Sequence, residues 1–93
     1  MRFVANSQPG DGVTRERLLQ YFADHDIKTT TWDLVRHRVV TEYAFKVGAR
    51  PGLVVFLDVD SEEDAAEVVN SFPIVAQGLL AFDIDPVLPV AKF

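Results

Sequence analysis

A run of five apolar residues, Leu53-Val54-Val55-Phe56-Leu57, constrains the fold of this chain more than any other sequence feature. The run is short, contains two β-branched valines, and follows a turn rich in glycine and proline at residues 48–52. Together these features predict a strand rather than part of a buried helix. Because side chains alternate along a strand, this strand presents large apolar groups on both faces of its sheet.

Three further segments carry the signals of strands. Residues 1–7 contain the apolar stretch Phe3-Val4-Ala5 and end before a turn that contains Pro9. Residues 41–47 alternate between bulky and polar side chains, and in residues 79–88 two apolar side chains alternate with Asp83 and Asp85. We therefore predict strands over residues 1–7, 41–47 and 79–88.

Two segments carry the signals of helices. Apolar residues recur at helical spacing after Thr14, which is a suitable N-cap, and this predicts one helix over residues 15–38. The β-branched residues 29–31 weaken its middle, so a break into two shorter helices there is the alternative. A second helix is expected to begin after the Ser61 cap and to end at Pro73.

The predicted order is strand, helix, strand, strand, helix, strand, in one domain over residues 1–93. This order is typical of the ferredoxin-like α+β fold, a four-stranded antiparallel sheet with both helices on one side. Two helices cover only one face, and leaving the second apolar face in water forgoes on the order of several kcal/mol. We expect a homodimer, paired sheet to sheet as an α+β barrel, or a higher homo-oligomer. The alternative is a monomer whose C-terminal tail covers the sheet.

Composition excludes several classes of function. Nine basic and fourteen acidic side chains give a net charge of −5, which argues against binding to nucleic acid or to an anionic membrane. No apolar run has the length of a membrane span, we expect no secretory leader, and a cytoplasmic location is the default. The chain has no cysteine, two histidines without a third ligand in register, and no phosphate loop or dinucleotide motif, so we expect no metal and no cofactor.

Three segments of the C-terminal half, residues 56–61 (FLDVDS), 71–74 (SFPI) and 82–88 (FDIDPVL), resemble the muconolactone isomerase family. The turn at residues 48–52 also looks like the Gly-Arg turn of that family. The resemblance implies a dimeric α+β barrel that isomerises a lactone without a metal or an organic cofactor. Phe45 and Lys46 stand roughly where the family has Trp and Arg. The wider superfamily also includes cofactor-free oxygenases and proteins without a known substrate.

Aromatic and ionisable residues share one stripe of the predicted first helix at spacings of three and four: Phe22, His25, Thr29, Trp32 and Arg36. On this stripe His25 is the candidate catalytic base and Arg36 the candidate holder of a substrate carboxylate. Phe22 and Trp32 would form the apolar wall of the pocket. Alternatively His25, which lies between two aspartates, is a solvated surface residue.

Three strand residues complete the candidate site. Lys46 is a second candidate for holding an anion, and Asn6 is a polar residue that is expected to face the cavity. Tyr43 is a candidate for binding the substrate, with the alternative that it packs with its hydroxyl outward. The acidic residues are explained by helix caps and solvated faces, so we assign them no chemistry.

These residues support two functions of different classes. The first is a cofactor-free isomerase that moves a proton on a lactone or a small cyclic acid. The second is a non-catalytic dimeric protein that binds a ligand or acts as an accessory, and a cofactor-free oxygenase of the same superfamily is a third possibility. The enzyme requires that His25 and Arg36 point into one cavity, whereas the binding protein does not.

Overall fold

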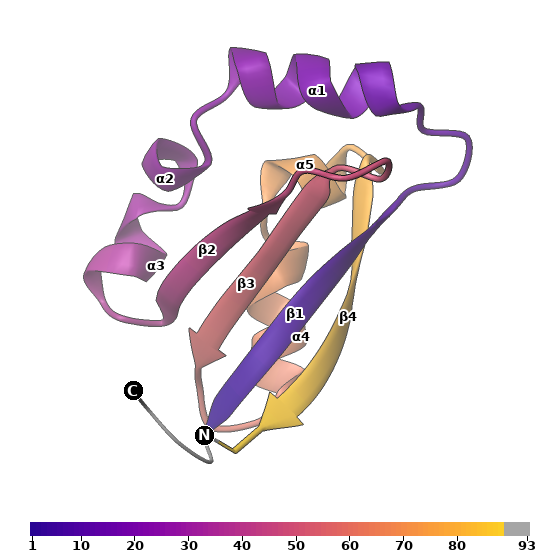
Figure 1. Ribbon diagram of the computed structural model, residues 1–93. Coiled ribbons are helices and arrows are strands. Elements are labelled where there is room, and N and C mark those ends of the chain that lie inside the picture. Colours follow the sequence, from indigo (N-terminus) through magenta and orange to yellow (C-terminus); the bar gives the residue numbers. More distant parts are fainter. Residues whose placement is uncertain (89–93) are drawn as a thin grey trace.

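The computed structural model describes residues 1–88, and its centre is a four-stranded antiparallel sheet in the order β2-β3-β1-β4 (Figure 1). The elements are β1 (Arg2–Pro9), α1 (Arg15–Asp24), α2 (Ile27–Thr30), α3 (Trp32–Arg36), β2 (Val40–Lys46), β3 (Gly52–Asp58), α4 (Glu62–Asn70), α5 (Pro73–Ala76) and β4 (Leu80–Val87). Each of the four predicted strands is present with its ends within two residues of the prediction. The ferredoxin-like α+β fold is confirmed.

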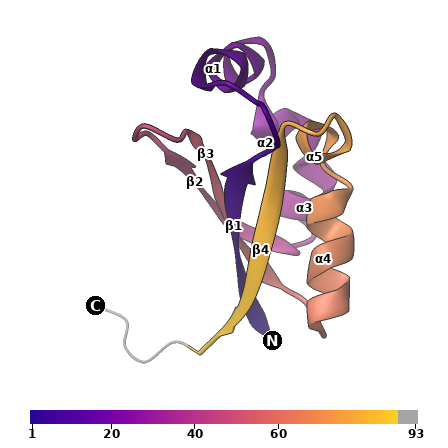
Figure 2. The ribbon, with the colours of Figure 1, turned by 90° about the vertical axis from the view of Figure 1, so that its right-hand side faces the viewer.

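Helices α3, α4 and α5 lie on one side of the sheet (Figure 2), whereas α1 lies beyond one end of it (Figure 1). The face that they cover carries buried side chains from the two central strands, because Phe3 and Ala5 of β1 pair with Leu57 and Val55 of β3. Alternation along β3 directs Val54 and Phe56 to the other face, where each is half-buried. The predicted two-sided apolar strand is therefore present, and no helix among residues 1–88 covers its second side.

The second helix forms where the sequence indicates. The Ser61 hydroxyl accepts a hydrogen bond from the backbone N–H of Asp64 at 3.1 Å, and Ala65 and Val69 are the buried residues of α4. Pro73 lies beyond the end of α4, as predicted, and also begins the short helix α5, because its fixed φ suits the first helical position.

The prediction of one continuous helix over residues 15–38 is wrong. His25 and Asp26 have extended backbone dihedrals that separate α1 from α2, and Thr31 separates α2 from α3. The Asp26 carboxylate accepts hydrogen bonds from the N–H of Lys28 at 3.1 Å and from the hydroxyl of Thr29 at 2.8 Å. This cap starts a new helix in place of continuing the old one. The alternative of a break near residues 29–31 matches only the second of the two interruptions.

A buried hydroxyl joins the central strands where their ladder ends. The Ser7 Oγ accepts a hydrogen bond from the backbone N–H of Leu53 at 2.8 Å, and Ser7 is almost fully buried. A Cβ atom at Gly52 would lie 2.2 Å from this oxygen, so only glycine fits there.

No helix of the described residues is long and apolar enough to cross a membrane. The alternative monomer, in which the C-terminal tail covers the sheet, depends on residues 89–93, which lie outside the described part of the chain.

Candidate functional site

The interruptions after α1 and α2 separate the residues of the predicted stripe. Phe22 and His25 remain together at the end of α1, whereas Trp32 begins α3. Arg36 lies at the far end of α3, exposed, with its guanidinium 3.2 Å from the carboxylate of Asp33. Arg36 and His25 therefore do not face one cavity.

His25 is exposed but its ring is held by Tyr21. The two rings stack with their centroids 4.0 Å apart and their planes 15° apart. The Nδ1 atom of His25 lies 3.0 Å from the backbone carbonyl oxygen of Tyr21. Because a carbonyl only accepts hydrogen bonds, this contact requires a proton on Nδ1, and in the neutral ring the lone pair is then on Nε2. Nε2 has no hydrogen-bond partner within residues 1–88 and can accept a proton from a ligand.

His25 lines a hollow of about 440 Å³ between the end of α1 and strand β2, which we call the aromatic hollow. Its lining residues are Phe22, Ala23, Asp24, His25, Asp26, Ile27 and Phe45. The rings of Phe22 and Phe45 meet edge to face with their centroids 5.4 Å apart. The hollow is thus lined by two aromatic rings and by a histidine whose Nδ1 is held by the backbone.

A second hollow adjoins the first through Asp26 and is lined also by Lys28, Thr29 and Trp32, with a volume of about 490 Å³. Trp32 is 47% exposed, and the Lys28 ammonium lies 5.6 Å from the centre of its ring. Lys28 is a cation beside the predicted residue Trp32, and sequence reasoning missed it. The signal was its spacing of four residues from Trp32.

Tyr43 lies on β2 and forms a hydrogen bond with the hydroxyl of Thr31, at the junction of α2 and α3. Burial raises the pKa of the Tyr43 hydroxyl above its ordinary value, and the bond to Thr31 partly opposes this. Desolvation likewise raises the pKa of Tyr21. Tyr43 thus connects the helical segment to the sheet, and it does not line the aromatic hollow.

Asn6 and Lys46 contact each other away from the aromatic hollow. The Lys46 ammonium donates to the side-chain oxygen of Asn6 at 3.1 Å and to the backbone oxygen of Ser7 at 2.9 Å. Asn6 lies between the buried Ala5 and Ser7, so its side chain points to the sheet face that the helices leave open.

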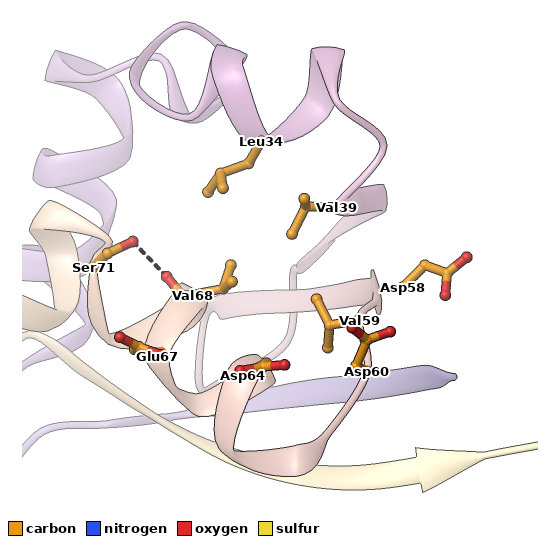
Figure 3. Close-up of a pocket in the computed structure, with 9 residues that line it drawn as sticks. All are labelled: Leu34, Val39, Asp58, Val59, Asp60, Asp64, Glu67, Val68 and Ser71. Atoms are coloured by element: carbon orange, nitrogen blue, oxygen red, sulfur yellow. Dashed lines mark hydrogen bonds between the residues drawn. The ribbon is translucent and has the colours of Figure 1, made fainter.

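A groove between α3 and α4, of about 570 Å³, contains none of the predicted site residues (Figure 3). We call it the α3–α4 groove. It is lined by Leu34, Val39, Asp58, Val59, Asp60, Asp64, Glu67, Val68 and Ser71. Sequence reasoning missed it because it assigned the acidic residues to caps and solvated faces, and because α3 and α4 are far apart in the chain. Within residues 1–88, no three histidine or acidic side chains are grouped to hold a metal ion.

No family model matches the chain, and no curated protein matches it. The structure is similar to a solved structure of 5-chloro-2-hydroxyhydroquinone dehydrochlorinase from Burkholderia phenoliruptrix AC1100, in complex with 2,5-dihydroxybenzoquinone. The TM-score is 0.69 with 15% sequence identity, and the match covers 95% of this chain and 94% of the other. The two proteins therefore share their fold over almost their whole lengths, which by itself assigns no activity.

Proposed function

We propose that this protein is a small enzyme that moves a proton on a flat cyclic substrate bound in the aromatic hollow, with His25 as the base. One observation carries the proposal: Tyr21 fixes the His25 ring by stacking and through its carbonyl, and His25 lines the same hollow as Phe22 and Phe45. A base that is oriented through its second nitrogen is a common element of catalytic sites.

The substrate class that fits best is a lactone or a related small cyclic acid, as for the muconolactone isomerases. Two aromatic walls favour a planar ring, and the dehydrochlorinase of the same fold was solved with a hydroxylated quinone. His25 would take a proton from the carbon beside a carbonyl group and return it to another carbon of the same enolate, so no atom is gained or lost. The Lys28 ammonium, which lies over the Trp32 ring in the adjoining hollow, would hold the anionic end of the substrate.

We also propose that two copies associate through the open face of the sheet. Val4, Val54 and Phe56 on that face are half-buried apolar side chains with no helix over them. A second copy would remove them from water, and charged side chains of both signs surround them: Arg2, Glu42, Asp83 and Asp85.

A second candidate function is non-catalytic binding of a small cyclic compound. It is favoured because both residues predicted to hold the anion contact other side chains: Arg36 contacts Asp33, and Lys46 contacts Asn6. Under this hypothesis the aromatic hollow holds its ligand without turnover.

The test is a panel of lactones, catechol-derived acids and hydroxyquinones, measured both for a rise in unfolding temperature and for turnover. For a compound that is turned over, His25→Ala should lower kcat about 10²- to 10⁴-fold while the ligand still stabilises the protein. The matched control is His37→Ala. His37 is also exposed, and its Nδ1 lies 2.8 Å from the Asp33 carbonyl oxygen, but it lines neither hollow. Full activity in His25→Ala would remove His25 from the mechanism, and binding without any turnover would favour the second candidate.

A further inference from the structure

We infer that the α3–α4 groove binds a small organic cation, an ammonium group on an apolar body. This inference is independent of the proposed function, because the groove and the aromatic hollow have no lining residue in common.

The walls of the groove are apolar. One wall is formed by Leu34 of α3 and by Val39, which lies between α3 and β2. The other wall is formed by Val59 and Val68. Figure 3 shows these four side chains directed toward the space between the two helices, and all four are only half-buried. The volume of about 570 Å³ is within the range of sites for small molecules. An occupant with an apolar body would complete the burial of these side chains.

Acidic side chains at the rim of the groove favour a positively charged ligand. Four carboxylates line the groove, those of Asp58, Asp60, Asp64 and Glu67, and no basic side chain does. The helix dipole accounts for Asp64, in the first turn of α4, but Glu67 lies one turn later and Asp60 precedes the cap. Asp64 and Glu67 are three residues apart on the helix, where like charges repel each other. A cation in the groove would relieve this repulsion.

An ammonium group already contacts one end of the rim. The N-terminal ammonium of Met1 lies 3.3 Å from the Asp58 carboxylate. Asp60, Asp64 and Glu67 have no ion-pair partner within residues 1–88. The groove therefore combines apolar walls with three carboxylates that are available to a second cation, and a small amine of matching length fits both.

The test is a titration of the full-length protein with phenylpropylammonium chloride, followed by two-dimensional amide NMR and calorimetry. Two control compounds separate the contributions: phenylpropionate has the same body with the opposite charge, and methylammonium has the charge without the body. Only phenylpropylammonium should bind, and it should shift the amides of Leu34, Val39 and Val68.

Removing the charges of the rim should weaken this binding. We expect Asp64→Asn and Glu67→Gln to weaken it about three-fold each and about ten-fold together, as for exposed ion pairs. Glu63→Gln is the matched control, since it removes the same charge from α4 outside the groove and should leave the affinity unchanged.

Three results would overturn the inference. The first is equal binding of phenylpropionate or methylammonium, and the second is an equal loss of affinity in Glu63→Gln, which would indicate non-specific attraction. The third is a shift of the groove amides with protein concentration and not with the amine, which would make a second copy of the chain the occupant.

Discussion

The contribution of the Ser7 hydroxyl to the free energy of unfolding can be measured with a single substitution. It accepts the N–H of Leu53 in an almost fully buried site, so Ser7→Ala leaves that N–H without a partner. A buried donor without a partner costs about 1–3 kcal/mol, and we expect a decrease of that size in the free energy of unfolding in urea. The control is Ser71→Ala, which removes an exposed hydroxyl that donates to the Val68 carbonyl. Equal effects of the two substitutions would contradict the role given to Ser7.

Some residues of the candidate site could be identified from the sequence, and others could not. His25 could be chosen as a candidate from the sequence, because a stripe that mixes Phe and Trp with His and Arg differs from a plain core stripe. Its partners could not all be selected, because the contact of the aromatic hollow with Phe45 depends on how β2 lies against the end of α1. Arg36 was selected by its helical spacing from Trp32, which still holds within α3, but its spacing from His25 has no meaning across two helix ends.

At the scale of elements, local signals predicted the strands and α4 because each boundary has its own residue, such as the Ser61 cap or Pro73. The first helical segment was mispredicted for the opposite reason. Apolar residues recur at helical spacing both before and after residue 26, and only the preference of Asp26 for a capping position marks the break. A short polar residue in the middle of an apolar pattern is compatible with both a helix interior and a helix start, so spacing alone cannot decide between them.

The Asp26 cap has a testable dependence on pH. The hydrogen bond from the Thr29 hydroxyl, followed by the backbone N–H bonds, lowers the pKa of Asp26 below its ordinary value. The unfolded chain therefore takes up this proton more readily than the folded one. The stabilisation is complete above the ordinary pKa and is lost as the pH falls through the lowered value.

Two variants separate the cap from its charge. Asp26→Asn retains an acceptor for the cap but cannot titrate, whereas Asp26→Ala removes the cap. We expect Asp26→Ala to lower the unfolding midpoint in urea at neutral pH. The difference between wild type and Asp26→Asn should shrink as the pH falls below the ordinary aspartate range. A difference that does not change with pH would show that the charge of Asp26 does not contribute to the cap.

At the scale of the whole molecule, the fold could be predicted because few topologies satisfy the observed order of elements with one strand apolar on both faces. The α3–α4 groove could not, because its walls come from residues 34–39 and 58–71, which meet only after the sheet has formed. Local patterns determine which elements form, whereas cavities depend on how distant elements pack. Of the predicted site residues, Phe22 and His25 line the aromatic hollow and Trp32 lines the adjoining one, whereas the others lie elsewhere.

The apolar side chains on the open face of the sheet predict that two copies of the protein associate through it. If two copies pair through it, Phe56 lies in the interface, and Phe56→Glu would bury an unpaired charge in each subunit at a cost on the order of 3 kcal/mol. Because Phe56 faces away from the helices, the variant should retain its circular dichroism spectrum. Sedimentation velocity should then show a dimer for wild type and a monomer for Phe56→Glu. Glu42→Gln, which changes the residue opposite Phe56 in register, should remain dimeric. A wild-type protein that sediments as a monomer at micromolar concentration would contradict the pairing, since the half-buried valines of that face would then be stable in water.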